Sequence, residues 1–375
     1  MKLTDICDFQ GGSQPPKEEW SNEKQKGYIR MLQIRDFTQS GRVTPEYIKL
    51  SKSTKVCEAD DILIARYGAS VGKILTGLAG AYNVAIMRTI PDTNRIQKKY
   101  LYYYLKSFYF QKAILNVGSR AAQAGFNKED LSKLDIECPN KTKQNEIVRI
   151  LELTESIIEK RYAELESLDN LIKARFVEMF GDININDKNW NCEPLGDLCT
   201  IVRGGSPRPI EQFLGGDVPW IKIGDATDGD NIYLSSTKEH IIQEGVRKSR
   251  LVKTGSLIFA NCGVSLGFAR IITFDGCIHD GWLAMEDIDE RLDKVFLLQA
   301  LNQMTEHFRA IAPAGTQPNL NTTIMKAYKQ VIPPIELQRD FIRFAEQVNK
   351  SKVVIQAALD KSQLLFDSLM QKYFG

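Results

Sequence analysis

Few residues of this sequence combine the types and the spacing that catalysis requires. The segment Gly68–Lys73, GASVGK, has the glycines and the lysine of a phosphate-binding loop, but it is one residue too short, and Ile74 stands where a Mg²⁺-binding hydroxyl is needed. His279 and Asp280 could form a general-base pair, although adjacent turn residues of these types are more often only solvated. No N-P-P-[FYW] or D-P-P-Y stretch of an aminomethyltransferase occurs, and the three histidines show no metal-ligand spacing. We therefore expect no catalytic centre and no metal site in this chain.

A different polar segment occurs twice. GTQPNLN, residues 315–321, has a near twin in AAQAGFN, residues 121–127, which lies 194 positions earlier. Both segments end on an asparagine, and Asp130 follows the first one three residues later, which is the signal of a helix N-cap. The loops are therefore interpreted mainly as structural joints. The alternative is that Gln123 and Gln317 contact a ligand at equivalent places.

The repeated loop belongs to a repeat of the entire chain. LTDIC (3–7) returns as LGDLC (195–199), GGS (11–13) as GGS (204–206), and ILIARYGASVG (62–72) as LIFANCGVSLG (257–267). The offset varies between about 189 and 195 in the early part and is then constant at 194. A varying offset indicates loop insertions, and a constant offset indicates a rigid element of fixed length.

Each copy has a globular part followed by a tail. The globular parts read as short β-rich segments separated by Gly, Pro, Ser and Asp turns, and each carries one helical run, at residues 100–115 and 295–311. The predicted organisation is a globular domain at 1–140, a long helix at 141–181, a second globular domain at 182–335 and a second long helix at 336–375.

The tails have the pattern of coiled-coil helices. Residues 142–180 contain no proline and no glycine, and apolar side chains recur at steps of seven. The predicted helix-contact residues are Leu151, Ile158, Leu165, Ile172, Met179, Val348, Ile355, Leu359, Phe366 and Leu369. A heptad with polar interruptions predicts a coiled coil of defined register. At a rise of 1.5 Å per residue, about 39 residues make a rod of roughly 60 Å.

Connectivity constrains how these parts are arranged. The first helix leaves the first domain and ends at the second, and the second helix leaves the second domain. If the second domain is compact, its entry and exit are close, so the helices pair antiparallel and Gly375 returns near Met1. The expected fold class is α+β, with two similar globular domains joined by two long antiparallel coiled-coil helices, pseudo-twofold and circularly arranged.

Composition and charge exclude several classes of protein. Hydrophobic residues make up 43% of the chain, yet no run of about 18 apolar residues occurs and the N-terminus has no apolar signal segment, so we expect no membrane span and no secretion. The 7 cysteines are odd in number and form no C-x-x-C pair, which fits free thiols in a cytoplasmic protein.

The net charge is only +2 and is unevenly distributed. Residues 1–140 contain 21 Lys and Arg against 15 Asp and Glu, whereas residues 182–335 contain 15 against 19. This balance does not indicate a protein that holds nucleic acid by charge alone, so any polyanion binding must come from local patches or from partner subunits.

The order of the motifs resembles a known family. The GGS loop followed by proline, PWIKIGD at 219–225, the strands ending in GASVG or GVSLG, the TQPNL loop, and the P-x4-Q lead into a long helix are similar to type I restriction-modification specificity subunits. The resemblance covers essentially all 375 residues, including the order of domain, helix, domain and helix.

The resemblance implies a non-catalytic reader of double-stranded DNA. Each target-recognition domain would read one half of a bipartite target, and the helices would set the gap and dock the modification subunits. Those methyltransferase subunits would bind S-adenosylmethionine and methylate adenine after flipping it from the duplex. Restriction subunits, which are endonucleases and translocases, would join and use ATP with Mg²⁺. Catalysis would reside in the partners, with no cofactor bound by this chain.

The residues that contact bases are expected on loops after strands, where Arg, Lys, Gln and Asn can reach base edges. The candidates are Gln14, Arg35, Arg66, Lys73 and Gln123 in the first domain, and Arg208, Lys222, Asn261, Arg270 and Gln317 in the second. Arg66 and Asn261 occupy equivalent positions before a glycine turn, where Arg would suit guanine and Asn would suit adenine. The alternative for each residue is a surface charge or a turn cap.

Three other functions stay open at the level of the sequence. The chain could be a stand-alone bipartite DNA-binding regulator, a coiled-coil scaffold for protein interactions, or an enzyme with an unrecognised site. Tight sequence-specific binding by the chain alone would favour the regulator, and turnover by the purified chain would contradict the absence of catalysis.

Overall fold

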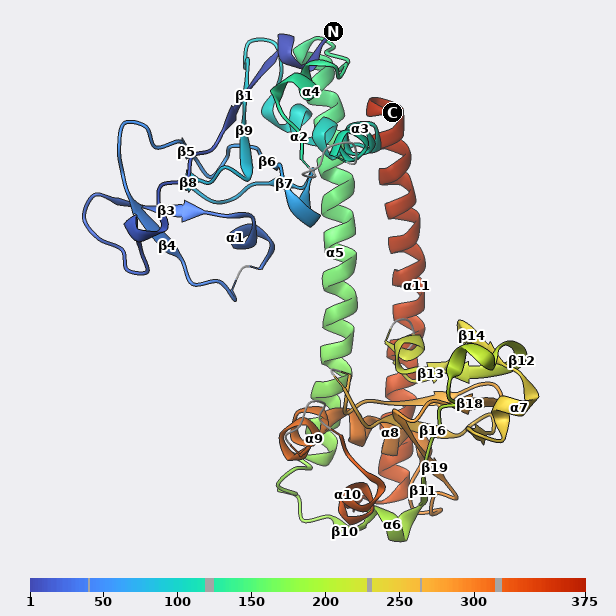
Figure 1. Ribbon diagram of the computed structural model, residues 1–375. Helices are drawn as coiled ribbons and strands as arrows, with labels where there is room; N and C mark the ends of the chain where they lie inside the picture. Colours follow the sequence, from blue (N-terminus) through green and yellow to red (C-terminus); the bar gives the residue numbers. More distant parts are fainter. Residues whose placement is uncertain (40, 119–124, 228–230, 264, 314–318) are drawn as a thin grey trace. The chain divides into compact units, whose positions relative to one another are not determined.

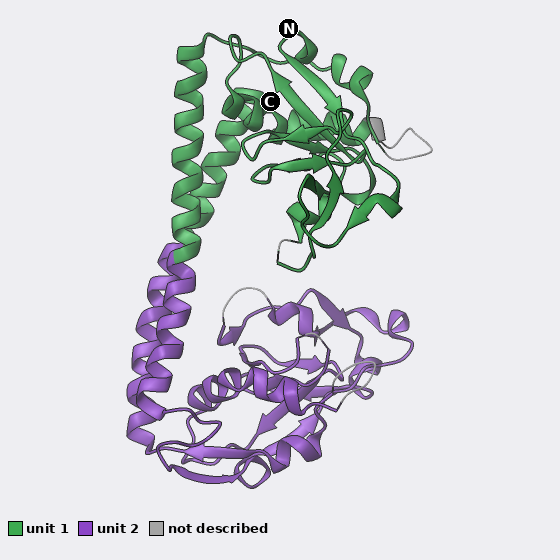
Figure 2. Ribbon diagram, turned by 90° about the vertical axis from the view of Figure 1, so that its left-hand side faces the viewer, with its two compact units in different colours: residues 1–163, 356–375 green, residues 164–355 purple. Residues whose placement is uncertain are grey.

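The chain folds into two compact units. The computed structural model describes residues 1–39, 41–118, 125–227, 231–263, 265–313 and 319–375. Unit 1 contains residues 1–163 and 356–375, and unit 2 contains residues 164–355 (Figure 2). Each unit holds one sheet-rich domain together with part of the long helix α5 (Lys141–Phe180) and part of the long helix α11 (Ile335–Phe374). The α+β class is therefore confirmed, whereas the four-segment division stays a prediction because the units divide within both long helices.

In its described residues, the domain of unit 1 contains two sheets and four α-helices (Figure 1). Its strands are β1 Cys7–Gly11, β2 Trp20–Ser21, β3 Tyr28–Leu32, β4 Glu46–Lys49, β5 Val56–Cys57, β6 Leu63–Ala65, β7 Ile74–Leu75, β8 Gly80–Tyr82 and β9 Ile86–Pro91. Its helices are α1 Ile34–Thr38, α2 Lys98–Lys106, α3 Phe108–Gly118 and α4 Lys128–Ser132. The strand orders are β1-β9-β6-β7 and β2-β4-β3-β8-β5.

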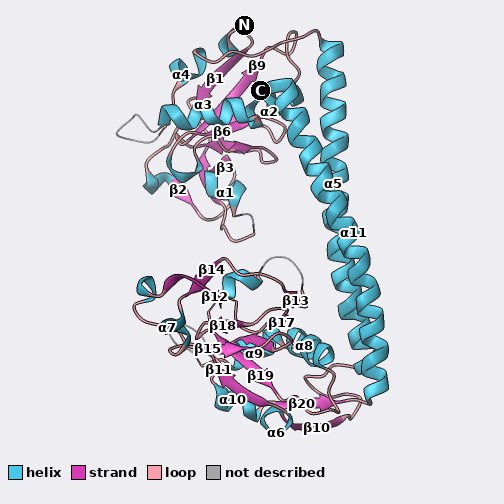
Figure 3. Cartoon of the chain, turned by 90° about the vertical axis from the view of Figure 1, so that its right-hand side faces the viewer, coloured by secondary structure: helices cyan, strands magenta, loops and turns pink. Residues whose placement is uncertain are grey.

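The described part of the unit 2 domain contains three sheets and five α-helices (Figure 3). Its strands are β10 Asn191–Pro194, β11 Thr200–Arg203, β12 Leu214–Ile221, β13 Tyr233–Leu234, β14 Glu239–Ile241, β15 Arg250–Val252, β16 Leu257–Ala260, β17 Ala269–Ile272, β18 Gly276–Ile278, β19 Trp282–Glu286 and β20 Lys329–Ile332. Its helices are α6 Leu195–Leu198, α7 Gln243–Val246, α8 Lys294–Gln303, α9 Thr305–Ile311 and α10 Thr322–Ala327. The strand orders are β11-β19-β16-β17-β13, β14-β12-β18-β15 and β10-β20.

Strand order and register show that the two domains share one topology. In each domain one parallel pair lies within an otherwise antiparallel sheet, β3 with β8 in the first and β12 with β18 in the second. The second domain has a further parallel pair, β13 with β17, in its other large sheet. Leu32 faces Tyr82, and Ile221 faces Ile278. Leu32 thus corresponds to Ile221 and Tyr82 to Ile278, and the sequence offset differs between these two pairs. The change of offset within one domain reflects loops of different length, as the sequence predicted.

Register also corrects one detail of the repeat. Gly12 and Gly204 donate backbone hydrogen bonds to the equivalent carbonyls of Ile86 and Trp282, at 3.0 Å and 2.9 Å. The structural match is therefore Gly12 with Gly204. Aligning the two GGS triplets letter by letter instead pairs Gly11 with Gly204, one residue out of register.

The helical runs predicted at 100–115 and 295–311 are each two helices. The first is interrupted at Ser107, whose extended backbone (φ −65°, ψ 152°) ends α2, and the second at Met304, between α8 and α9. Ser107 is buried and its hydroxyl accepts a hydrogen bond from the N–H of Phe110 at 3.3 Å. A side chain that bonds to the local backbone in this way competes with a continuous helix.

Within unit 2 the long helices run antiparallel. Asp169 of α5 forms an ion pair with Lys352 of α11, with Oδ1 and Nζ 2.6 Å apart. Further along α5, Phe176 contacts Phe341, which precedes Lys352 in α11, with ring centroids 5.3 Å apart. Later residues of α5 thus contact earlier residues of α11, which is the pattern of an antiparallel pair. The two helices lie side by side in Figure 1 and Figure 3.

The helix surfaces divide into buried and exposed stripes. All ten predicted helix-contact residues are buried or half-buried. In unit 1, the α11 residues Phe366 and Phe374 pack against Tyr103 and Tyr100 of α2, with centroids 6.4 Å and 5.0 Å apart. In the part of the chain that the structure describes, no helix is both long and apolar enough to cross a membrane.

Gln144 fixes the start of α5 to the first domain. The side chain is fully buried, and its Oε1 accepts a hydrogen bond from the N–H of Gln97 at 2.8 Å. Its Nε2 donates to the carbonyls of Arg95 at 2.9 Å and Pro139 at 2.8 Å. One amide therefore joins the first turn of the long helix to the segment before α2 and to the proline that precedes α5.

Gln338 makes the same three bonds at the start of α11. Oε1 accepts from the N–H of Asp293 at 2.9 Å, and Nε2 donates to the carbonyls of Arg291 at 2.8 Å and Pro333 at 2.7 Å. The P-x4-Q motif is thus a clamp between each long helix and the domain that precedes it.

Candidate nucleic-acid interface

A polar turn links the two sheets of the first domain at residues 83–85, between β8 and β9. Oδ1 of Asn83 accepts a hydrogen bond from the N–H of Ala85 at 3.2 Å. Gly12 lies directly against this turn, because a Cβ atom on Gly12 would stand 2.1 Å from the carbonyl oxygen of Asn83. A side chain at this position would collide with backbone, so the approach of the loop after β1 requires glycine.

The second domain builds the same turn around His279. The N–H of Gly281 donates to Nδ1 of His279 at 2.9 Å, and a Cβ atom on Gly204 would stand 2.1 Å from the His279 carbonyl oxygen. Because Nδ1 accepts a hydrogen bond, the ring proton is assigned to Nε2, which lies 3.0 Å from Oδ1 of Asp280. The histidine thus takes the place of Asn83.

Asp280 collects the charges around this second turn. Its Oδ1 accepts from the Ser206 hydroxyl at 2.8 Å, its Oδ2 lies 3.6 Å from Nη2 of Arg208, and its carbonyl accepts from Nε of Arg203 at 3.0 Å. Burial alone would raise the pKa of Asp280, but the Ser206 hydroxyl, His279 and the two arginines lower it below its usual value. Burial lowers the pKa of His279, so its imidazole is mainly neutral at pH 7.

Equivalent residues after β6 and β16 close onto the repeated loop. Nε of Arg66 donates to the carbonyl of Phe126 at 3.3 Å, and Nδ2 of Asn261 donates to the carbonyl of Leu320 at 3.1 Å. The backbone N–H groups of Arg66 and Asn261 bond to the last carbonyl of the polar turn, at 2.8 Å and 2.9 Å. These contacts join the polar turn to the loop before α4 or α10.

The asparagines that end the repeated loops are helix N-caps, as predicted. Oδ1 of Asn127 accepts from the N–H of Asp130 at 3.0 Å, and Oδ1 of Asn321 accepts from the N–H of Ile324 at 2.9 Å. In its described part, the repeated loop is therefore a structural joint.

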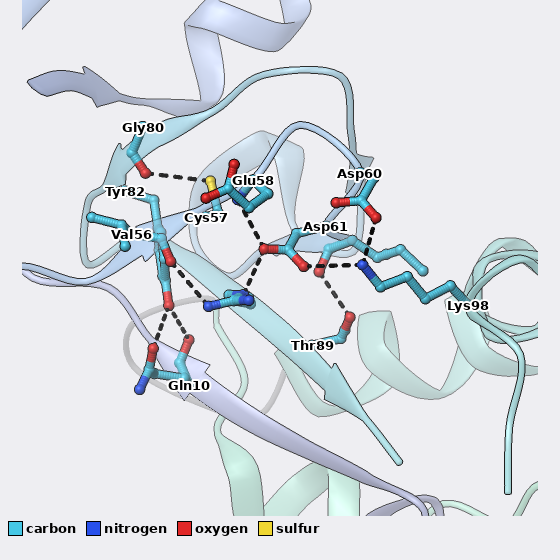
Figure 4. Close-up of polar contacts among 12 residues, drawn as sticks. Gln10, Val56, Cys57, Glu58, Asp60, Asp61, Gly80, Tyr82, Thr89 and Lys98 are labelled. Atoms are coloured by element: carbon cyan, nitrogen blue, oxygen red, sulfur yellow. Dashed lines mark hydrogen bonds and ion pairs between the residues drawn. The ribbon is translucent and has the colours of Figure 1, made fainter. Parts of the chain in front are cut away.

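The first domain contains a polar network around Asp61 (Figure 4). The buried carboxylate of Asp61 pairs with Nε of Arg88 at 2.8 Å and lies 3.5 Å from Nζ of Lys98. By strand register, the matching residues of the second domain are Ser256 and Ala284, which carry no charge. Arg88 therefore neutralises a buried carboxylate inside the domain and is not available to a ligand.

The structure places the predicted base-contacting residues in different environments. Gln14 and Lys73 are exposed. Arg35, Lys222 and Arg208 are ion-paired with Glu46, Glu239 and Asp280. The Arg208 side chain is still 81% exposed, which makes it the more accessible of the three cations. Gln123 and Gln317 lie outside the described residues.

Two predicted contacts do not fit their positions. Asn261 is 0% exposed and Arg270 is 8% exposed, and Nη1 of Arg270 donates to the carbonyl of Ala269 at 2.8 Å. Asn261 uses its amide inside the joint, so neither side chain can reach a base edge from this conformation. The prediction overlooked that a polar side chain after a strand can be needed by a neighbouring loop.

Arg203 is exposed beside the polar turn but is not among the predicted base-contacting residues, because of the register of the repeat. Aligning the two GGS triplets leaves Arg203 without a notable partner, whereas the LTDIC and LGDLC match places it opposite Gly11. Strand pairing agrees with the second alignment, since Gly11 faces Met87 and Arg203 faces Leu283.

Among the described residues, no group of three or more His, Cys, Asp or Glu side chains could hold a metal ion.

Comparison with known proteins gives a family match over most of the chain. The type I restriction modification DNA specificity domain matches twice, at residues 1–167 and 187–361. The chain is 22% identical over 175 residues to the type I restriction enzyme MjaIX specificity subunit of Methanocaldococcus jannaschii, covering 45% of this chain and 40% of that protein. It is 23% identical over 273 residues to the putative MjaX specificity subunit of the same organism, covering 68% of this chain and 62% of that protein.

The matched segments thus span between 40% and 62% of the length of these curated relatives. A solved chain from a study of complex assembly in a type I R-M system aligns over 100% of this chain and 99% of its own, with a TM-score of 0.62 at 15% identity. At that identity the likeness supports the fold alone.

Proposed function

Because the chain belongs to the type I restriction modification DNA specificity family, with two copies of its domain, we propose that each domain reads one half of a bipartite DNA target. The long helices then set the gap between the half-targets. The chain itself catalyses nothing, and methylation and cleavage are carried out by partner subunits bound to it.

One observation carries this proposal, namely that the same sheet topology occurs twice in one chain with different side chains on the same joints. The polar turn is built with Asn83 in one domain and His279 in the other. The joint is closed by Arg66 in one and Asn261 in the other. Shared backbone geometry with divergent polar groups suits two readers of different sequences.

The clamps Gln144 and Gln338 support the ruler function of the helices. A helix can transmit a spacing only if its end is fixed to the domain that it positions. Each glutamine bonds its helix to one segment of the preceding domain, residues 95–97 or 291–293, and to the proline before the helix. The test is to insert one heptad in both long helices together. The gap in the recognised motif should change while both half-targets stay the same, and altered half-targets would contradict the ruler.

Exposed apolar side chains on the long helices support docking of the modification subunits. In unit 1 they include Leu153, Leu364 and Leu365, and in unit 2 Val353 and Val354, each more than half exposed. Consecutive apolar residues at this exposure indicate a surface that a partner covers. These partners would bring S-adenosylmethionine, and the restriction subunits would bring ATP with Mg²⁺.

Methylome sequencing of the host, with and without this gene, tests the proposal. We expect a bipartite motif with methylated adenine that disappears when the gene is deleted. Exchanging residues 1–140 for another recognition domain should alter one half-target only. An unchanged methylome, combined with tight sequence-specific binding by the chain alone, would instead support a stand-alone regulator.

A further inference from the structure

A guanidinium lies at the same place in both domains, although different residues supply it. In the first domain, Nη1 of Arg66 lies 3.5 Å from the carbonyl oxygen of Val84 and donates to it at the surface. In the second domain, Nε of Arg203 donates to the carbonyl of Asp280 at 3.0 Å. Val84 and Asp280 are the middle residues of the two polar turns, so the two carbonyls are equivalent.

The two arginines come from different strands and exchange places between the domains. By register, Gly11 at the end of β1 matches Arg203 at the end of β11, and Arg66 after β6 matches Asn261 after β16. A Cβ atom on Gly11 would lie 3.1 Å from Nη1 of Arg66. A side chain at position 11 would therefore press on the Arg66 guanidinium, which would have to shift to make room.

Both guanidinium groups keep their charge available. Within the described part of the chain, neither Arg66 nor Arg203 forms an ion pair, whereas Arg88 is paired with Asp61 and Arg208 with Asp280. Arg203 is exposed, and Arg66 is half-buried over the ring of Tyr67 at 5.0 Å. Backbone carbonyls orient both groups, and the charge of Arg203 also acts on the nearby carboxylate of Asp280, whose pKa it lowers.

We infer that Arg66 and Arg203 bind phosphates of the DNA backbone at equivalent places in the two half-targets. The inference rests on the proposed function. Domains that read different bases share only the sugar-phosphate backbone of their targets, and contacts to that backbone fix the position of a protein without carrying sequence information. A positive charge that occupies the same place in both domains, although different residues supply it, is therefore expected to contact the sugar-phosphate backbone. Arg66 is therefore a positioning contact and not a reader of guanine.

Arg203→Gln and Arg66→Gln test the inference in the methyltransferase complex assembled on the full chain. Glutamine keeps an amide that can donate to the turn carbonyl, but the charge is lost. Because Arg66 also donates to the carbonyl of Phe126, the melting temperature of Arg66→Gln is compared with that of the wild type. We expect binding about ten-fold weaker to the motif duplex and to an unrelated duplex alike, and a salt slope reduced by about 1 for each variant. The methylated motif should stay unchanged.

Matched controls remove one exposed positive charge elsewhere in each unit. Lys253→Gln in unit 2 and Lys133→Gln in unit 1 alter side chains that are 73% and 63% exposed and paired with carboxylates. Their salt slopes should equal that of the wild-type chain. Unchanged slopes for Arg66→Gln and Arg203→Gln, with normal melting, would overturn the inference. So would relaxed specificity at one base, which would make the arginine a base reader.

The positional exchange gives a second test. Arg203→Gly alone should weaken binding and reduce the salt slope, and adding Asn261→Arg should restore both, because the second domain would then have the arrangement of the first. A folded double variant without restoration would contradict the shared position. If the double variant does not fold, the glutamine series still decides. Absence of any bipartite methylation would refute the proposed function itself, whereas the salt slope on unrelated duplex tests the arginines separately.

Discussion

Asn261 reaches across 59 residues of sequence to donate a hydrogen bond from its Nδ2 to the carbonyl of Leu320, at 3.1 Å and out of contact with solvent. In the reverse direction, the N–H of Leu320 bonds to the carbonyl of Asn261 at 2.8 Å. Side chain and backbone together make Asn261 the centre of a joint between the sheet and the loop that precedes α10.

Asn261→Ala should lower the free energy of unfolding by about 2 kcal/mol, because it leaves the buried Leu320 carbonyl without this donor. Urea unfolding measures the change. Asn170→Ala, at an exposed position of α5 in the same unit, should stay within about 0.5 kcal/mol of the wild type. Equal effects of the two substitutions would show that the joint contributes no stability.

Gln338→Leu should be more damaging, with a loss of about 3 kcal/mol in the free energy of unfolding, since it leaves one N–H and two carbonyls without their partner. Hydrogen exchange should accelerate most in the first turn of α11, where the clamp acts. Gln363→Leu, which removes an exposed amide from the same helix, serves as the control. Uniform acceleration along α11 in the Gln338 variant would argue against a local clamp.

The stability of unit 2 should depend on the protonation of His279. Burial lowers the pKa of His279 below its ordinary value of 6.5, with Lys222, Arg208 and Arg203 acting in the same direction and Asp280 against them. As pH falls below about 6.5, the unfolded chain takes up a proton that the folded chain resists, so stability is lost in this range and is retained above it.

His279→Asn removes this titration and keeps a hydrogen-bond acceptor for the polar turn, since Asn83 occupies the matching position of the first domain. The melting temperature of the wild type should fall more steeply between pH 7 and pH 5 than that of the variant. Parallel pH profiles of the two proteins would show that protonation of His279 is not what lowers the stability.

Met1 and Gly375 line the same pocket of unit 1, and the N–H of Ile136 bonds to the carbonyl of Met1 at 2.9 Å. Joining these two residues with a short linker and opening the chain between the exposed Asn184 and Ile185 should therefore preserve cooperative folding. Melting followed by circular dichroism measures it. A broad, non-cooperative transition in the permuted chain would mean that the circular arrangement is wrong.

Local pattern predicted much of the fold. The heptads of the tails placed ten helix-contact residues that the structure finds buried or half-buried, because a seven-residue period reports directly which face of a helix packs. The interruptions at Ser107 and Met304 were not predicted, since one hydrogen bond to the local backbone does not alter the apolar pattern. Asn261 and Arg270 were assigned to an interface because exposure cannot be read from residue type.

The sequence by itself determined the duplication, the two long helices and the family, because each depends on the order and period of residues along the chain. The tertiary structure decided which residues correspond across the repeat and which charges are available. Arg66 and Arg203 are not matched by any alignment of the two copies. They occupy equivalent places in the two domains only because strands that are distant in sequence pair within one sheet of each domain. Side-chain hydrogen bonds between distant segments, such as those of Gln144, Gln338 and Asn261, depend on that pairing and leave little trace in local sequence.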